Sequence, residues 1–238
     1  MKPLAADVER VLKTLKKRWQ NPGAMHLEDP YRTVVGVALS ARTRDEQVLK
    51  LLPAFFKRFP SPKELAETRE TDIRQYIDTI GMYKQKAKNL KKLGTQLVRD
   101  FGGKVPCTME ELVTLAGVGR KTASVMMTAC FNSPAIAVDT HVHRVTNRLG
   151  WVKAATPPKT EEQLLKVVPK ELQPMVNQVF VKHGRYVCLP SPRCWMCPVR
   201  DVCAYKKKNL VPPKDADAIM QDVERREDAL ESSRRSLL

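Results

Sequence analysis

Apolar residues recur along most of this chain at the three- and four-residue spacing that places them on one face of a helix. The first such stripe runs from Val8 to Trp19, and the longest runs from Ala87 to Phe101, directly before Gly102-Gly103. No stretch alternates with period two for long enough to predict a strand, and no repeat of solenoid length is present. The pattern therefore predicts an all-α fold of about ten helices, most of them short.

Side chains that can cap a helix mark several of the expected starts. Ser61 and Thr108 each precede a glutamate by three residues, which is the capping-box pattern. Asp45, Asp139 and Thr160 are candidate N-cap residues, because each stands where a stripe of helical spacing begins. These five positions predict where five helices begin.

Prolines predict where the helical pattern is interrupted. Asn21-Pro22-Gly23 is expected to end the first helix. Pro53 stands inside the stripe from Val48 to Phe59 and is expected to kink or split that helix. After Pro212-Pro213 the chain is charged and poor in aromatic residues, so residues 211–238 are interpreted as a charged C-terminal tail or a single helix.

The charge of the chain narrows the class of partner. The 238 residues carry a formal net charge of +16, and the sequence pI is about 9.7. Such an excess favours a polyanion, and nucleic acid fits better than a membrane because no basic amphipathic helix with an aromatic apolar face is present. No apolar run approaches the roughly 20 residues that span a bilayer. The sequence therefore predicts a nucleic-acid partner and no membrane.

The six cysteines are expected to be thiols or metal ligands. The N-terminus has no apolar core of signal-peptide type, so a cytoplasmic protein is the default, and disulfides are rare in that compartment. Cys107 and Cys130 stand alone in the sequence and are interpreted as core or incidental residues.

The other four cysteines form the run Cys188-x5-Cys194-x2-Cys197-x5-Cys203. Prolines between them keep the backbone turning, which allows four thiolates to converge. The spacing indicates one metal centre, and by itself it leaves open an iron–sulfur cluster or a zinc ion.

A second motif lies between Leu115 and Ala123. Gly117 and Gly119 allow a tight turn and a close approach of the backbone to a partner. The N–H groups of the helix that follows are then available for a phosphate group, with the positive end of the helix dipole behind them. The segment matches a helix-hairpin-helix, a module that grips the DNA backbone without reading its sequence.

Two residues near this motif can carry chemistry. Lys121 stands one residue inside the second helix of the motif, where its amine could bind phosphate or attack an electrophilic sugar carbon and form a Schiff base. Asp139 lies eighteen residues further on at an expected helix start, where it can be both an N-cap and a fixed carboxylate. His141 and His143 lie two residues apart and would point in different directions, so a metal shared between them is not expected.

Taken together, these residues resemble the endonuclease III branch of the helix-hairpin-helix DNA glycosylases over roughly residues 5–208. Besides the hairpin with Lys121 and the four cysteines, the marks of the resemblance are Leu39-Ser40-Ala41 with Asp45, Ile80-Gly81-Met82-Tyr83 with Lys86-Ala87, Val138-Asp139-Thr140-His141, and His183-Gly184-Arg185-Tyr186.

The resemblance implies a helical fold of two discontinuous domains. Residues 23–133 would form a six-helix barrel that contains the hairpin, and residues 1–22 with 134–210 would form the domain that holds the cysteines. The cysteines would bind a [4Fe–4S] cluster in preference to zinc. That cluster would hold structure and help to present basic residues such as Arg193 and Arg200 to phosphate.

The resemblance also implies an activity. The family excises oxidised pyrimidines from double-stranded DNA, and Lys121 and Asp139 would face each other across a cleft that binds the DNA. Lys121 would attack the sugar of the flipped nucleotide, Asp139 would assist, and the Schiff base would permit strand cleavage by β-elimination.

The protein is expected to act as a monomer and to be associated with the nucleoid if its source is bacterial. The residues expected to contact DNA are Arg42, Met82, Gly117, Val118, Gly119, Arg120, Thr122 and His141.

The chain departs from the family pattern at two places, and two alternative functions are also open. The family commonly has glutamine where this chain has Arg42, as the side chain that fills the gap left by the flipped base, and Met82 would be the apolar wedge beside it. Five residues separate Cys188 from Cys194, where the family usually has six. The alternatives are a non-catalytic protein that binds distorted or abasic DNA, and an abasic-site lyase with weak base excision.

Overall fold

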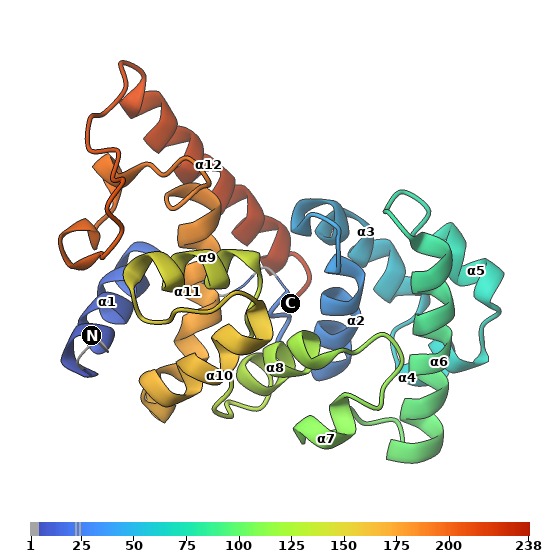
Figure 1. Cartoon of the computed structure of the whole chain (residues 1–238). Coiled ribbons are helices and arrows are strands. Elements are labelled where there is room, and N and C mark those ends of the chain that lie inside the picture. The colour runs from blue at the N-terminus through green and yellow to red at the C-terminus, as the bar shows by residue number, and fades with distance from the viewer. Residues whose placement is uncertain (1–4, 22, 24) are drawn as a thin grey trace. The chain divides into compact units, whose positions relative to one another are not determined.

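The computed structural model of the chain describes residues 5–21, 23 and 25–238, and the turn predicted at Pro22 lies outside them. These residues form twelve α-helices and three short 3-10 helices, with no strand among them, so the all-α prediction is confirmed (Figure 1). The helices are α1 (Ala5–Arg18), α2 (Pro30–Ser40), α3 (Asp45–Arg58), α4 (Pro62–Glu67), α5 (Glu70–Gln75), α6 (Tyr83–Phe101), α7 (Met109–Leu112), α8 (Arg120–Ala129), α9 (Thr140–Leu149), α10 (Pro157–Val167), α11 (Gln173–Tyr186) and α12 (Ala216–Arg235), with 3-10 turns at Lys170–Leu172, Cys194–Met196 and Arg200–Val202.

The chain divides into two compact units, each with its own apolar core. The first unit comprises Met1–Pro22 and Asn132–Arg226, and the second comprises Gly23–Phe131 and Glu227–Leu238. The division falls within α12, so this helix contributes residues to both units.

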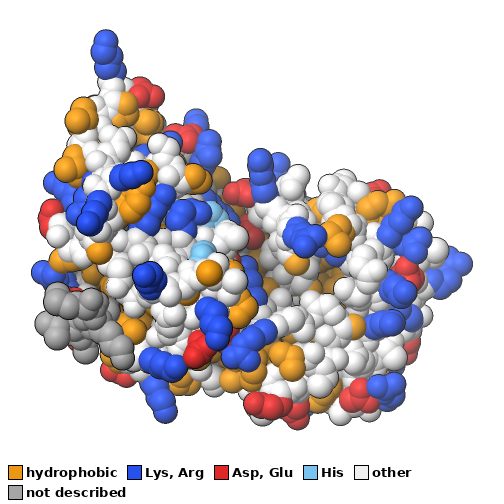
Figure 2. Space-filling model, viewed as in Figure 1, with side chains coloured by type: hydrophobic (Ala, Val, Ile, Leu, Met, Phe, Trp, Pro, Cys, Tyr) orange, Lys and Arg blue, Asp and Glu red, His pale blue; other side chains and the backbone are white. Residues whose placement is uncertain are grey.

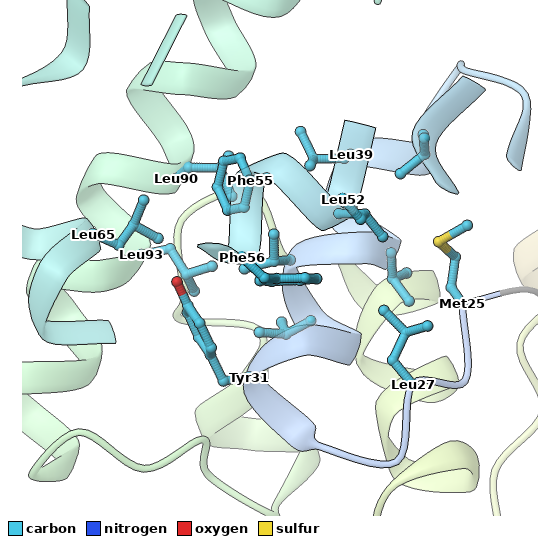
Figure 3. Packing of buried hydrophobic residues seen from close by; sticks show 14 of the residues in the cluster. Met25, Leu27, Tyr31, Leu39, Leu52, Phe55, Phe56, Leu65, Leu90 and Leu93 are labelled. Carbon is cyan, nitrogen blue, oxygen red and sulfur yellow. The ribbon is translucent and has the colours of Figure 1, made fainter. Parts of the chain in front are cut away.

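Aromatic side chains of α3 and of Phe59, the residue that follows it, belong to the core of the second unit, and Figure 3 shows Phe55 and Phe56 there. Phe55 and Phe59 are fully buried, and the ring of Phe55 meets that of Phe56 edge-on at 5.6 Å between centroids. Tyr31 of α2 packs on Phe56 and donates its hydroxyl to the Phe59 carbonyl at 3.1 Å. Each such ring stabilises the fold by roughly 1.5–3 kcal/mol through burial.

Helix α3 corrects the prediction at Asp45 and excludes one of the two outcomes expected at Pro53. Asp45 is the first helical residue, and Arg44 holds the N-cap position. Pro53 does not split the helix, which is continuous from Asp45 to Arg58. Proline removes one N–H from the helical ladder, and the buried Leu52 and Phe55 on either side of it anchor the helix to the core.

Helix α10 corrects another prediction. It begins at Pro157, one turn before Thr160, which is buried within the helix and donates its hydroxyl to the Thr156 carbonyl at 3.1 Å. Prolines at the first two helical positions favour a start there, because their fixed φ suits the first turn and their missing N–H is unneeded.

The long helix α6 packs closely against α4. A Cβ atom added at Gly94 would lie 2.9 Å from the backbone nitrogen of Ala66, so only glycine fits between the two helices. Helix α6 ends as expected at Gly102 and Gly103, which both have positive φ, and the Gly103 N–H donates to the Leu97 carbonyl at 2.8 Å.

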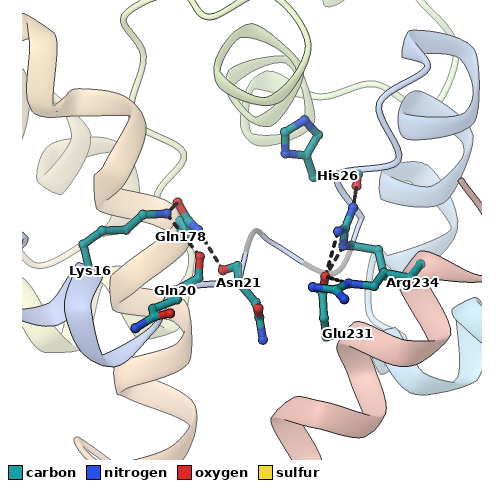
Figure 4. Close-up of polar contacts among 8 residues, drawn as sticks. Lys16, Gln20, Asn21, His26, Gln178, Glu231 and Arg234 are labelled. Carbon is teal, nitrogen blue, oxygen red and sulfur yellow. Dashed lines mark hydrogen bonds and ion pairs between the residues drawn. The ribbon is translucent and has the colours of Figure 1, made fainter.

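In the first unit the apolar stripe of α1 is buried as predicted, from Val8 to Trp19. Polar side chains at the end of α1 join it to α11. Lys16 donates to the side-chain oxygen of Gln178 at 2.9 Å, and Gln178 donates to the Asn21 carbonyl at 2.7 Å (Figure 4).

The C-terminal segment, interpreted above as a tail or one helix, contains α12. Leu230 and Leu237 belong to the core of the second unit. Between them Arg234 donates to both carboxylate oxygens of Glu231, at 2.9 and 2.8 Å, and to the His26 carbonyl at 3.0 Å (Figure 4). The end of the chain is therefore part of a folded unit.

Glu231→Gln is expected to lower stability at neutral pH by up to about 3 kcal/mol. Hydrogen bonds from the guanidinium groups of Arg234 and Arg235 lower the pKa of the buried Glu231 carboxyl from 4.5 to about 2. A lowered folded-state pKa adds stability above the unfolded value near 4.5, and this stability disappears as the pH falls toward 2. Urea unfolding of the wild type and the variant between pH 7 and pH 3 checks this.

The exposed Asp228 supplies the control for that measurement, because Asp228→Asn removes an equal charge from the same helix. The difference between Glu231→Gln and wild type should shrink as the pH is lowered, and Asp228→Asn should stay close to wild type. A deficit that is the same at every pH would contradict the ionic origin of the stabilisation.

Lysine and arginine side chains are scattered over the face shown in Figure 2, as the net charge of +16 leads one to expect. In the part of the chain that the structure describes, none of the helices combines the length and the apolar character that a membrane crossing needs.

Candidate functional site

The hairpin motif joins α7 to α8 in the second unit. Gly117 has a φ of +81°, and a Cβ atom there would lie 3.1 Å from the Cβ of Asn89 on α6. Gly119 has a φ of −88°, and a Cβ atom added to it would meet nothing within 4 Å. Gly117 is therefore required by the turn itself, whereas Gly119 leaves open space on the outer side of the backbone.

The side chain of Gln96 fixes the hairpin to α6. Its oxygen accepts from the Ala116 N–H at 2.8 Å, and its nitrogen donates to the Thr114 carbonyl at 3.0 Å. Val118 is 4% exposed and belongs to the apolar core, so its side chain anchors the turn and only its backbone can face a partner.

The start of α8 is suited to binding an anion. Its N-cap residue, Gly119, contributes no side-chain oxygen to the first N–H groups of the helix. Arg120 and Lys121 follow on the first turn with exposed side chains, and Thr122 is half-buried. The turn therefore presents backbone N–H groups, a guanidinium and an amine.

Two further residues expected to contact DNA lie in the same unit. Arg42 follows α2 with a φ of +56°, and Met82 is the N-cap of α6 with a φ of +61°. Both are exposed, Met82 by 54%. A positive φ is uncommon for residues with a side chain, so both positions are special in the fold.

Asp139 belongs to the first unit, whereas Lys121 belongs to the second. As predicted, Asp139 caps α9, and its Oδ1 atom accepts from the N–H groups of His141 at 2.9 Å and Val142 at 2.8 Å. Asn177 holds the segment just before Asp139 by donating to the Ala137 carbonyl at 2.9 Å. The carboxylate is thus held in one orientation by the backbone.

His141 packs directly against α11. A Cβ atom added at Gly184 would lie 2.7 Å from the Cβ of His141, so these two helices touch at this point. Burial is the main cause that lowers the pKa of His141, and the neighbouring Arg144 adds to it. Arg144 lies 3.1 Å from His141 Nδ1 and donates to the Gly184 and Cys188 carbonyls at 2.8 and 2.9 Å. One side chain therefore connects the start of α9 with the first of the four cysteines.

The four cysteines come together in the first unit. Cys188, Cys194, Cys197 and Cys203 line one cavity of about 30 Å³ beside apolar side chains of α9. Among the described residues, no three His, Cys, Asp or Glu side chains form a group that could hold a metal ion. The four cysteines are thus neighbours around one cavity.

Basic and polar groups surround this cavity. Arg148 donates to the Leu189 and Pro190 carbonyls at 2.6 and 2.8 Å, and its Nη1 atom lies 3.5 Å from Cys188 Sγ. Burial lowers the pKa of His183 to about 4, so its ring is neutral, and its Nε2 atom lies 3.5 Å from Cys197 Sγ. Burial also raises the pKa of Cys197 to about 12, so a thiolate at this position needs a positive charge beside it.

Sequence reasoning did not identify the roles of Gln96, Arg144, Arg148 and His183. The long-range hydrogen bonds and contacts described above for these four residues reach partners between 14 and 44 positions away. No spacing rule for a single helix or turn marks such contacts.

Comparisons with known proteins give a consistent result. The family described as "HhH-GPD superfamily base excision DNA repair protein" matches residues 35–170. Endonuclease III of Thermotoga maritima is 41% identical over 202 residues, which cover 84% of this chain and 94% of that protein. Endonuclease III of Escherichia coli strain K12 is 37% identical over 185 residues, covering 77% of this chain and 88% of that protein.

Solved structures agree with the sequence matches. The structure described as "Structure of a Trapped Endonuclease III-DNA Covalent Intermediate: Estranged-Adenine Complex" superposes with a TM-score of 0.77 at 33% identity. The similarity covers 84% of this chain and 96% of that one.

Proposed function

Because this chain belongs to the endonuclease III family within the HhH-GPD superfamily of base excision DNA repair proteins, we propose that it is a DNA glycosylase and abasic-site lyase. Its substrate is double-stranded DNA with a damaged base or an abasic site. The observation that carries the proposal is Lys121, an exposed amine on the first turn of α8, directly after a hairpin whose N–H groups can hold phosphate.

Lys121 is the nucleophile of the proposed reaction. Its neutral amine attacks the sugar C1′ atom, and the bond from C1′ to the base breaks, so that the base leaves with the bonding electron pair and takes up a proton. The sugar ring then opens to a Schiff base between Nζ and C1′. Loss of a proton from C2′ breaks the C3′–O bond and cleaves the strand by β-elimination.

Asp139 assists the first step by taking up the proton of the lysine ammonium or by stabilising positive charge on the sugar. Its two backbone hydrogen bonds hold the carboxylate in one orientation, which reduces the reorganisation needed during the reaction.

Oxidised pyrimidines are the proposed lesions. A weakly paired base costs less to flip out of the helix, and the gap that it leaves must be filled. Arg42 and Met82 are the exposed side chains proposed to enter this gap, the first as a hydrogen-bonding or stacking group and the second as an apolar wedge.

The four cysteines are proposed to hold a [4Fe–4S] cluster. The four thiols line one cavity and are the sulfur ligands that such a cluster would take, so Cys188, Cys194, Cys197 and Cys203 would hold it. Arg148 supplies positive charge beside Cys188 Sγ. At the buried Cys197, the bound metal would supply the positive charge that stabilises the thiolate. The cluster, when bound, contributes structure, because all four thiolates serve as ligands. Equal amounts of iron and acid-labile sulfide in the purified protein support this assignment, and zinc in their place contradicts it.

One duplex with an oxidised pyrimidine, assayed beside one duplex with an abasic site, tests the function. The proposal predicts base release and strand cleavage on the first duplex and cleavage on the second, with a covalent complex trapped by borohydride on both. Cleavage of the abasic duplex alone would indicate a lyase with weak base excision. Binding of both duplexes without cleavage would indicate a non-catalytic DNA-binding protein and would overturn the proposal.

A further inference from the structure

Lys86 is a buried lysine of the second unit that has no part in the proposed reaction. It lies on the first turn of α6 and is 8% exposed. Its Nζ atom donates to the Leu39 carbonyl at 2.8 Å and to the Thr43 hydroxyl at 2.6 Å. Both partners are uncharged, and burial lowers the pKa of Lys86. A buried lysine is costly unless its hydrogen bonds stabilise something in return.

The two partners of Lys86 lie on either side of Arg42. Leu39 is in the last turn of α2, where carbonyl groups lack partners within the helix, and Thr43 lies in the turn that leads to α3. An ammonium group at this helix end also interacts favourably with the helix dipole. Lys86 therefore closes a turn in which Arg42 adopts its positive φ of +56°.

The backbone of Lys86 is bonded to the other proposed gap-filling residue. Its N–H donates to the carbonyl of Met82 at 3.0 Å. Met82 adopts its positive φ of +61° at this point, as the N-cap of α6. Lys86 therefore contacts both the turn that contains Arg42 and the residue Met82, and Arg42 and Met82 are exposed residues with positive φ.

We propose that Lys86 is a positioning residue that holds the Arg42 turn against the Met82 end of α6 and so sets how these two side chains enter damaged DNA. This inference rests on the proposed function, since it assumes that Arg42 and Met82 fill the gap at the flipped base. Lys86 acts through them and does not itself touch the DNA.

Lys86→Met tests the inference, because methionine keeps the apolar stem and removes the ammonium. Affinity is measured for a duplex with a non-cleavable abasic analogue and for the same duplex undamaged. Loss of the two charged hydrogen bonds should weaken binding to the abasic duplex roughly 5- to 20-fold and binding to undamaged DNA much less. Lys88→Met is the matched control: it removes an exposed lysine from the same helix and should affect both duplexes equally.

A double-variant cycle separates positioning from general damage to the fold. In an Arg42→Ala background, Lys86→Met should weaken binding to the abasic duplex less than it does in the wild type, because one of the two side chains that Lys86 positions is already absent. Thr43→Val is nearly isosteric and leaves the bond from Lys86 to Leu39, so it should give the same pattern with a smaller effect in a protein that folds. Hydrogen exchange at residues 40–44 should be faster in both variants.

The outcomes distinguish this inference from the proposed function. A wild-type protein that does not prefer the abasic duplex overturns the proposed function and this inference with it. If the wild type has that preference, but the effects of Lys86→Met and Arg42→Ala multiply independently, only the positioning role of Lys86 is wrong. Equal weakening of both duplexes by Lys86→Met also overturns the positioning role alone.

Discussion

Lys121→Gln protein is expected to bind abasic DNA but to form no borohydride-trapped complex with it. Glutamine has nearly the length of lysine and can still donate a hydrogen bond, but its amide nitrogen is not nucleophilic. Without the Schiff base there is no route to β-elimination, so strand cleavage should fall roughly 10³-fold or more. Trapping with borohydride and cleavage on the abasic duplex measure the two effects.

Binding of the Lys121→Gln protein should change only a few-fold. The N–H groups at the start of α8 and the hairpin held by Gln96 remain in place. The matched control is Lys57→Gln, an exposed lysine of α3 in the same unit that has no part in the proposed chemistry. Trapping that persists at wild-type level in the Lys121→Gln protein would show that another amine is the nucleophile.

The second large effect is expected at Asp139, where two roles can be separated by two substitutions. Asparagine is as good an N-cap as aspartate, so Asp139→Asn should leave the stability of α9 nearly unchanged. It removes the negative charge, so the rate of base excision should fall by roughly 10²- to 10⁴-fold. Asp139→Ala should show the same loss of rate and a further loss of about 1 kcal/mol in stability. Single-turnover kinetics and thermal unfolding measure these quantities.

Asp29 provides a matched control for Asp139. It caps α2 in the same manner, with its Oδ1 atom accepting from the Arg32 N–H at 2.7 Å. Asp29→Ala should therefore reduce stability without a comparable effect on single-turnover rate. If Asp139→Asn retains the full rate of base excision, Asp139 is a helix cap and nothing more.

Several features of the fold could be predicted because their causes are local. The capping of α9 by Asp139, the end of α6 at Gly102 and the buried stripe of α1 each depend on residues within one or two turns of each other. Side-chain type and spacing along the sequence determine such contacts directly.

Two predicted helix features that the structure does not show have a common cause. The split considered at Pro53 and the cap expected at Thr160 each rest on the preference of one residue, and in both cases a competing interaction prevails. Packing of Leu52 and Phe55 keeps α3 continuous through Pro53, and the prolines before Thr160 begin α10 one turn earlier.

Taken by itself, the sequence determined the all-α class, the hairpin, the four-cysteine run and the identities of Lys121 and Asp139 as candidate reactive groups. Only the tertiary structure decided that Gln96 holds the hairpin, that Lys86 holds the Arg42 turn and that Arg148 faces Cys188. The first set follows from residue type and short-range spacing. The second joins residues 20 to 47 positions apart, and their proximity exists only once the helices have packed.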